Sequence, residues 1–294
     1  MSAAQAHPLG TTSIGGRDFR WGERTFVMGI VNVTPDSFSG DGLLAAGPAD
    51  PVQAALVQAA RMVAEGADLL DVGGESTRPG HEPVGADEES RRVVPIVAAL
   101  RAAQPDTPIS VDTTKPAVAA AALEAGASLI NDVWGVSHDD GLVRLAAEAS
   151  VPIVLMHNRD EPRYADLMTE LIDDLRRAID RALRVGCAWE SLIVDPGFGF
   201  GKTPEHNLTV LRELAALRVL ERPILLGTSR KSTLGRVLDL PPDERLEATL
   251  ATTALGIARG VDIVRVHDVE ANVRVARMTD AIVRGGPGGV EELA

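Results

Sequence analysis

The fold is decided by a repeating unit that residues 109–132, ISVDTTKPAVAAAALEAGASLIND, contain in full. A short apolar run ends in Asp112, an Ala-rich stretch begins at Pro116, and Gly126 separates that stretch from a second apolar run. Proline is favoured in the first turn of a helix and glycine just past its end, so the pattern predicts strand, helix and strand. A helix of this kind is the usual connection between two parallel strands.

The same unit recurs along the whole chain. We expect strands at Phe26–Val31, Leu69–Val72, Ile109–Val111, Ser128–Ile130, Ile153–Met156, Leu192–Val194, Ile224–Leu226 and Ile263–Val266. Helices are expected near residues 51–65, 87–102, 116–125, 140–149, 166–186, 206–219, 244–259 and 270–284. Eight alternating pairs predict an α/β fold, a single (β/α)8 TIM barrel. A doubly wound sheet is the alternative, but it gives no reason for eight pairs of such regularity.

The two ends of the chain fall outside this pattern. Residues 1–25 form an N-terminal extension, in which RDFRWGERT at residues 17–25 predicts a small hairpin that plugs the bottom of the barrel. The barrel itself is expected to span residues 26–284. Residues 285–294 are Gly-rich and carry few apolar side chains, so we expect a disordered tail.

Composition excludes several classes of protein. The net charge of −13 argues against binding to nucleic acid or to an anionic membrane surface. No apolar run is long enough to span a membrane, and the first residues lack the pattern of a signal peptide. Cys187 is the only cysteine, which excludes an internal disulfide, so a cytoplasmic location is expected.

Polar side chains follow the expected strands at the point where each strand ends. The set is Asn32, Asp112, Asn131 with Asp132, His157, Asp195, Ser229 to Ser232, and Arg265 with His267. Barrel enzymes place their chemistry at this carboxyl end of the strands. Polar residues resume after any strand, which explains one or two of these positions. It does not explain carboxylates and carboxamides that directly adjoin apolar runs at four strands.

These groups suit two kinds of ligand. Asp112, Asn131 and Asp195 are short acceptors that with the donor Lys231 could clasp a flat heterocycle. Arg265, His267 and Arg78 form a cationic set that suits phosphates or a carboxylate. Asn32 offers a neutral oxygen to Mg²⁺, which proteins bind with few ligands when a phosphate supplies the rest. The combination predicts a reaction that displaces diphosphate.

Four other features have more than one interpretation. GFGFGKT at residues 197–203 is similar to a phosphate-binding loop, but Pro196 stands where that motif needs glycine, so a glycine-rich loop close to a ligand is favoured. Lys115 fits helix-start solvation as well as catalysis, and Lys202 fits the surface as well as the rim of the site. Asp71, inside the second strand, fits a structural role as well as a functional one.

Longer motifs resemble one known family. MGIVNVTPDSFSGDG (residues 28–42) and GADLLDVGGESTRPG (residues 66–80) are similar to the two signature segments of dihydropteroate synthases. SVDTTKP, LINDVWG, VLMH, VDPGFGFGK, GTSRKS and IVRVHDV follow in that family's order. The resemblance spans residues 26–284. It implies condensation of 6-hydroxymethyl-7,8-dihydropterin diphosphate with p-aminobenzoate to give 7,8-dihydropteroate and diphosphate in folate biosynthesis, with Mg²⁺ as cofactor and a homodimer as assembly.

The resemblance also implies a role for each site residue. Asn32 would ligate Mg²⁺ together with the diphosphate, which would be held by Thr77, Arg265 and His267. The pterin ring would be bound by Asp112, Asn131, Asp195 and Lys231, with Met156 and Phe198 against its faces. The p-aminobenzoate site would be bordered by Arg78, Pro79, Phe200 and Ser232. The catalytic residues are expected to be Asp36, Asp112, Lys231 and Arg265, with the two carboxylates stabilising a pterin methylene cation.

Two loops depart from the family's pattern. The first loop reads Ser39-Gly40-Asp41, one residue out of the usual register, and MHNRDEPRYADL at residues 156–167 is shorter than the family's Met-His-Met-Gln-Gly stretch. Two alternative functions remain: a pterin-binding methyltransferase domain, or a catalytically silent pterin-binding paralogue. The cationic set at Arg265 and His267 weighs against both, because neither needs a diphosphate site.

Overall fold

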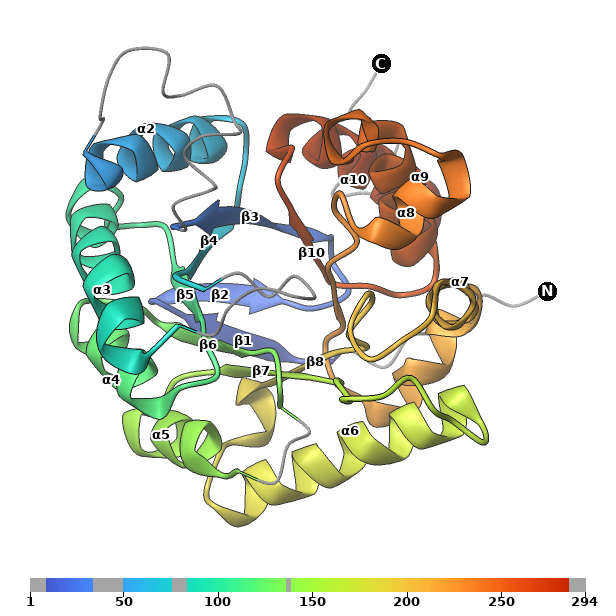
Figure 1. Ribbon diagram of the computed structural model, residues 1–294, viewed down its shortest axis with the longest axis horizontal. Helices are drawn as coiled ribbons and strands as arrows, with labels where there is room; N and C mark the ends of the chain where they lie inside the picture. The colour runs from blue at the N-terminus through green and yellow to red at the C-terminus, as the bar shows by residue number, and fades with distance from the viewer. Residues whose placement is uncertain (1–8, 34–49, 76–83, 136–138, 286–294) are drawn as a thin grey trace.

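The chain forms a closed barrel of parallel strands. The computed structural model describes residues 9–33, 50–75, 84–135 and 139–285 (Figure 1). The strands are β3 (Phe26–Asn32), β4 (Leu69–Gly73), β5 (Ile109–Asp112), β6 (Leu129–Asp132), β7 (Ile153–Met156), β8 (Leu192–Asp195), β9 (Leu225–Leu226) and β10 (Ile263–Val266). They pair in the order β8-β7-β6-β5-β4-β3-β10-β9, and a parallel bridge between Val194 and Ile224 joins the two edges. The predicted TIM barrel is confirmed.

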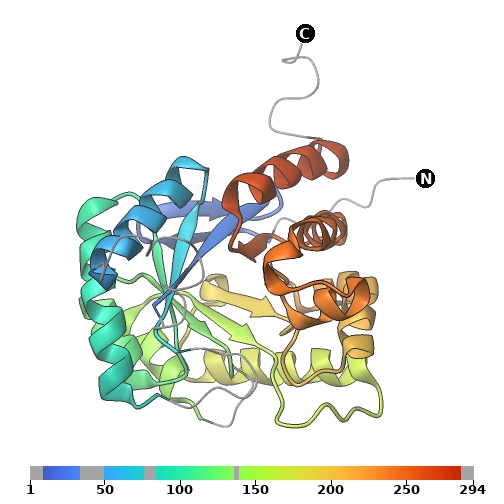
Figure 2. The ribbon, with the colours of Figure 1, turned by 45° about the horizontal axis from the view of Figure 1, so that its top comes forward.

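Helices cover the outside of the barrel, one after each strand in most units (Figures 1 and 2). They are α2 (Pro51–Ala64), α3 (Ala86–Ala103), α4 (Pro116–Glu124), α5 (Gly141–Ala149), α6 (Leu167–Arg184), α7 (Pro204–Glu213), α9 (Leu246–Ala258) and α10 (Val269–Val283). All eight were expected. Short elements that the sequence pattern did not predict are α8 (Ser232–Leu238) and the 3-10 turns η1 (Trp189–Ser191) and η3 (Pro242–Glu244). The helix predicted near 206–219 ends earlier, at Glu213, and the chain continues as the 3-10 helix η2 (Leu214–Leu220).

Glycines end the helices where the sequence predicted. Gly66, Gly126, Gly186 and Gly260 have φ of 103°, 114°, 104° and 95°. Side chains disfavour these angles, so glycine lets the chain turn from each helix into the following strand. None of the helices in the described ranges is long and apolar enough to cross a membrane.

The N-terminal hairpin plugs the barrel, but the predicted residues were wrong. Its strands are β1 (Thr11–Ile14) and β2 (Arg17–Arg20), not a hairpin over residues 17–25. Gly15 and Gly16, with φ of 57° and 84°, make the tight turn that a two-residue hairpin loop requires. The buried side chains of this region pack on the first inward-facing residues of the barrel strands, and the cluster contains Ile14, Phe19, Trp21, Phe26, Met28, Leu69, Leu129, Val154, Ile193, Leu225 and Ile263.

The inside of the barrel changes from apolar to polar along the strands. Side chains two residues apart point to the same face of a strand. Two positions beyond the apolar layer, the inward-facing residues are Asp71 on β4, Asn131 on β6, Met156 on β7, Asp195 on β8 and Arg265 on β10. The hairpin closes the apolar end, so this polar layer lies toward the carboxyl ends of the strands.

The aromatic side chains of the hairpin plug are expected to contribute to the stability of the fold. Phe19 is 1% exposed, and its ring centroid lies 4.7 Å from that of Phe26 and 5.8 Å from that of Trp21. Replacing it by alanine would remove a buried ring at the end of the barrel opposite to the polar layer. We expect Phe19→Ala to lower the free energy of unfolding by about 3–5 kcal/mol. Urea unfolding measures the loss, and Asp18→Ala, which changes an exposed side chain on the same strand, should alter it little. A loss below about 1 kcal/mol would show that the hairpin is not part of the core.

Candidate active site

The centre of the site is a guanidinium shared by two buried carboxylates. Nε of Arg265 donates to Oδ2 of Asp71 at 2.6 Å, and Nη2 donates to Oδ2 of Asp112 at 2.7 Å. Nδ2 of Asn131 also donates to Oδ2 of Asp71 at 3.1 Å. Strands β4, β5, β6 and β10 are therefore tied together at one level of the barrel. This resolves the two interpretations of Asp71: its carboxylate, 0% exposed, orients two of the predicted site residues.

Two carboxylate oxygens in this layer lack a partner. Oδ1 of Asp71 and Oδ1 of Asp112 are buried without a hydrogen bond in the described structure. Buried polar atoms are usually paired, so such atoms mark a place where a ligand can bind. Burial raises the pKa of Asp112 to about 7, against the opposing effect of the Arg265 charge. Burial also raises the pKa of Asp195.

Lys231 faces the same layer from the loop after β9. Its ammonium donates to the carbonyl oxygen of Phe198 and lies 4.3 Å from the ring centroid of Phe200. Burial lowers the pKa of Lys231 to about 8, although Asp195 opposes the shift. The charges of Lys231 and Asp195 therefore interact, and one group is a donor while the other is an acceptor.

The glycine-rich loop after β8 approaches closely because it lacks side chains at alternate positions. Gly197, Gly199 and Gly201 have φ of 67°, 85° and 54°. A Cβ on Gly199 would lie 2.8 Å from Cδ of Lys231. Oδ1 of Asp195 accepts from the backbone N–H of Gly197 at 2.7 Å, which sets the start of the loop. The loop thus comes close to Lys231, and its approach to a ligand stays a prediction.

The loop after β9 is fixed by a strained residue. Arg230 has φ of 58°, an angle that residues other than glycine adopt at a cost. Its guanidinium is held by both carboxylate oxygens of Asp268, at 2.7 and 3.1 Å. Sequence reasoning missed this pair, although both residues adjoin predicted site residues. The strained turn places Lys231 before α8, whose first residue, Ser232, is exposed.

The remaining predicted residues fall into two groups. His267 lies after β10, with Nδ1 2.9 Å from Oγ of Ser229. Met156 is buried at the end of β7, Phe198 is buried, and Asn32 is half-buried at the end of β3. Asp36, Thr77, Arg78 and Pro79, and the shifted Ser39-Gly40-Asp41, lie outside the described residues.

Lys115, whose role the sequence left open, forms ion pairs with two carboxylates. Its ammonium pairs with the carboxylate of Glu75 and with Oε2 of Glu89, the latter at 2.6 Å. Oε1 of Glu75 accepts from the backbone N–H of Val84 at 3.2 Å. Lys115 therefore links Glu75, the residue before segment 76–83, to Glu89 of α3. Its role is an ion-pair bridge and not solvation of a helix start.

Comparison with known proteins agrees with this geometry. Residues 28–267 match the family described as pterin binding enzyme. The chain therefore belongs to the pterin-binding enzyme family. Similar proteins within the family include dihydropteroate synthases. That of Clostridium beijerinckii is 50% identical over 272 residues, which are 92% of this chain and 99% of the relative.

Solved structures give the same result. The dihydropteroate synthase of Clostridium difficile, determined in the presence of pteroic acid, has a TM-score of 0.85 and 49% identity, covering 90% of this chain and 98% of that one. The dihydropteroate synthase of Xanthomonas albilineans with 4-aminobenzoic acid has a TM-score of 0.86 and 42% identity, covering 92% and 97%. The resemblance found in the sequence is confirmed.

The raised pKa of the buried Asp112 predicts that the stability of the fold depends on pH. Its pKa is about 7 in the folded protein, against 3.8 ordinarily. Between these values the folded state keeps a proton that the unfolded chain has lost. The stability that this group contributes is therefore full below about pH 4 and is lost as the pH rises to about 7, by a few kcal/mol in all.

Unfolding free energies of wild type and Asp112→Asn, measured by urea between pH 4 and 8, test this. The wild type should lose stability relative to the variant as the pH rises, because asparagine does not titrate. Asp106→Asn, at an exposed position, should follow the wild type. A constant difference between wild type and Asp112→Asn over this range would contradict the assignment.

Proposed function

We propose that the chain is a dihydropteroate synthase, which condenses 6-hydroxymethyl-7,8-dihydropterin diphosphate with p-aminobenzoate to give 7,8-dihydropteroate and diphosphate. The observation that supports this most is that Asp112 and Lys231 adjoin Asn131, Asp195 and Arg265 of the polar layer. A pterin edge offers N–H donors and acceptors, and a diphosphate needs cations. Relatives at about 50% identity carry this name.

The pterin ring is assigned to the acceptors of the polar layer. The unpaired Oδ1 of Asp112 and the carboxylate of Asp195 can accept from ring N–H and NH2 groups. Asn131 and Lys231 can donate to ring nitrogen or carbonyl oxygen. Met156 and Phe198, both buried beside this layer, supply apolar contact for the faces of the ring.

The diphosphate is assigned to Arg265, His267 and Thr77, with Mg²⁺ as its counterion. Asn32 would be the protein's oxygen ligand to that ion. The described residues contain no group of three His, Cys, Asp or Glu side chains that could hold a metal alone. A cation bound mainly by phosphate oxygens and water, as Mg²⁺ commonly is, fits this donor set. When bound, Mg²⁺ would neutralise charge on the departing diphosphate.

The chemistry then depends on charge stabilisation. The bond from the pterin methylene carbon to the diphosphate oxygen breaks, and the electron pair leaves with the diphosphate toward Arg265, His267 and Lys231. The carboxylate of Asp112, joined by Asp36, stabilises the methylene cation. The neutral amine of p-aminobenzoate attacks that carbon and loses one proton. An arylamine is unprotonated at neutral pH, so no strong general base is required.

The second substrate is assigned to the rim. Arg78 would pair with the carboxylate of p-aminobenzoate, and Pro79, Phe200 and Ser232 would border its ring. Phe200 is half-buried, with the Lys231 ammonium over its ring, and Ser232 is exposed at the start of α8. Both residues follow the carboxyl ends of strands, which form the mouth of the barrel.

We also propose a homodimer in the cytoplasm. Apolar side chains are exposed on neighbouring helices α7, α8 and α9, namely Leu208, Val237, Leu238 and Leu255. Helix α7 contacts both α8 and α9, and exposed apolar side chains on adjoining helices favour an interface. Cys187 is a free, buried thiol, as suits a reducing compartment.

A diphosphate-release assay tests the proposed function. With Mg²⁺ and pterin diphosphate, release should depend on p-aminobenzoate and should yield dihydropteroate in equal amount. Asp195→Ala should weaken pterin binding by about 1–3 kcal/mol, roughly five- to a hundredfold, because a buried ring edge would lose its acceptor. Asp173→Ala, an exposed carboxylate on α6, is the matched control and should change neither quantity.

The outcomes separate the alternatives. Release without any need for p-aminobenzoate, or no release, would contradict the proposal. A catalytically silent paralogue would bind pterins with no gain from Mg²⁺, and a methyltransferase domain would bind pterins that lack phosphates as tightly as the diphosphate.

A further inference from the structure

The glycine-rich loop after β8 has side-chain donors on most of its carbonyl oxygens. Nζ of Lys202 donates to the carbonyls of Gly197 and Phe200, both at 3.1 Å. The Tyr164 hydroxyl donates to the carbonyl of Gly201 at 2.7 Å, and Lys231 donates to that of Phe198. Three glycines in five residues leave such a loop many conformations, so these bonds select one of them.

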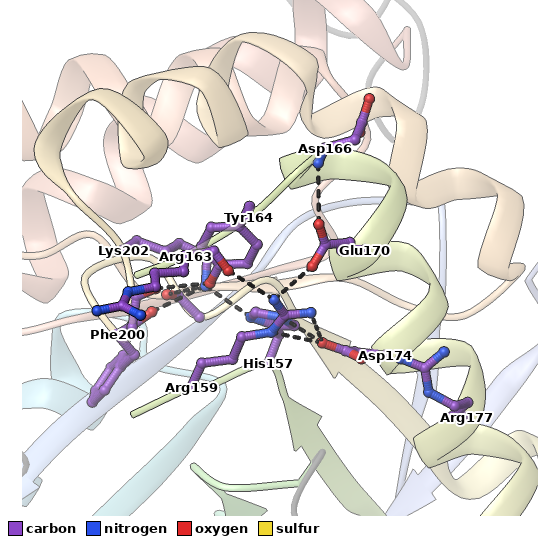
Figure 3. A network of polar contacts seen from close by, with 12 residues as sticks. His157, Arg159, Arg163, Tyr164, Asp166, Glu170, Asp174, Arg177, Phe200 and Lys202 are labelled. Carbon is purple, nitrogen blue, oxygen red and sulfur yellow. Dashed lines mark hydrogen bonds and ion pairs between the residues drawn. The ribbon is translucent and has the colours of Figure 1, made fainter. Parts of the chain in front are cut away.

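Lys202 is itself held by a relay that leads to α6. A third acceptor of Nζ is Nδ1 of His157, at 2.9 Å, and Nε2 of His157 lies 3.2 Å from Oδ2 of Asp174 (Figure 3). His157 is 0% exposed, and burial, followed by the Lys202 charge, lowers its pKa to about 3. The imidazole is therefore neutral: Nδ1 accepts from Lys202, and Nε2–H donates to Asp174.

The three acceptors around Nζ match the three N–H donors of an ammonium. Burial lowers the pKa of Lys202 to about 7, with Asp195 opposing that shift and Lys231 adding to it. Below that pH every donor of Lys202 has a partner. Removing the side chain would leave two loop carbonyls and one ring nitrogen without their donor.

The segment after β7 forms a second brace on the same loop. The guanidinium of Arg159 pairs with Glu170 and Asp174 of α6, each at 2.7 Å, and lies 4.6 Å from the ring centroid of Tyr164. A Cβ on Gly197 would overlap the carbonyl of His157, and one on Gly201 would overlap that of Arg159. The loop therefore rests directly on this segment, as Figure 3 shows for Tyr164, His157 and Lys202.

This segment lies in the shortened stretch MHNRDEPRYADL, where the chain departs from the family's pattern. The contacts of this segment indicate what it does: it supports the glycine-rich loop. Tyr164, the only tyrosine of the chain, reaches the glycine-rich loop from it.

We propose that Lys202 and Tyr164 are positioning residues for the arylamine substrate: anchored to α6 through His157 and Arg159, they fix the glycine-rich loop and so the placement of Phe200 at the rim. This rests on the proposed function, in which Phe200 borders p-aminobenzoate. Asp112, Asn131 and Asp195, which are proposed to bind the pterin edge, stand on β5, β6 and β8 and not on this loop. The carbonyl of Phe198 keeps its donor Lys231 when Lys202 or Tyr164 is replaced. Loss of the brace should therefore weaken the second substrate selectively.

The test compares Lys202→Met and Tyr164→Phe with wild type at pH 6.5, which is below the pKa of Lys202 of about 7. We expect the KM for p-aminobenzoate to rise at least tenfold in Lys202→Met and about threefold in Tyr164→Phe, a loss of one hydrogen bond. The KM for pterin diphosphate should stay within twofold. Arg176→Met is the matched control, because it breaks an exposed ion pair with Asp173 on the same helix.

Unchanged KM values for p-aminobenzoate in both variants would overturn the proposal. So would a parallel rise of both KM values, because that result means general loosening of the fold. If Lys202→Met does not fold, Tyr164→Phe alone decides, since it removes a single oxygen.

Hydrogen exchange separates this inference from the proposed function. If the wild type releases no diphosphate, the proposed function fails. The brace is then judged by amide exchange at residues 197–201, which should be at least tenfold faster in Lys202→Met than in wild type. Equal exchange rates would overturn the brace whatever the activity.

Discussion

The site depends on one interaction, the pairing of the Arg265 guanidinium with the carboxylates of Asp71 and Asp112. Three charged groups taken out of water inside a barrel are costly unless they are paired and hydrogen-bonded. Here the pairing is nearly complete, and the oxygens that stay unpaired belong to the two carboxylates. The internal hydrogen bonds of this cluster therefore orient Arg265, and the unpaired carboxylate oxygens remain as acceptors for a ligand.

The distribution of cations explains how an acidic protein can bind two anionic substrates. The net charge is −13, yet the three lysines of the chain, Lys115, Lys202 and Lys231, all lie in or next to loops at the carboxyl ends of strands. Two of them are desolvated, which lowers their pKa values to about 7 and about 8. A positive charge that is shielded from solvent and close to a ligand attracts an anion more strongly than a distant surface charge does, because salt screens surface charges beyond roughly 8 Å.

Most of the fold and the floor of the site could be predicted from the sequence, because both follow from local periodicity. Every strand end carried its own signal, and closure of the barrel brought Asp112, Asn131, Asp195 and Arg265 together. The rest depends on contacts between distant segments. Asp71 looked like any strand residue until its partner Arg265, 194 positions away, was placed beside it. The hairpin was misplaced because its turn is formed by Gly15 and Gly16, ahead of the predicted residues 17–25. Lys202 could not be assigned, since its three acceptors come from two loops.

The site requires the position of Arg265 as well as its charge. The most direct measurement is the rate of diphosphate release by Asp71→Asn, which keeps the shape of the side chain but removes the charge that holds Nε of Arg265. Asp71 orients Arg265 and Asn131 through its Oδ2. We expect a kcat at least about tenfold below wild type, the equivalent of one charge-assisted hydrogen bond, with the barrel still folded. A wild-type kcat in folded Asp71→Asn would contradict it.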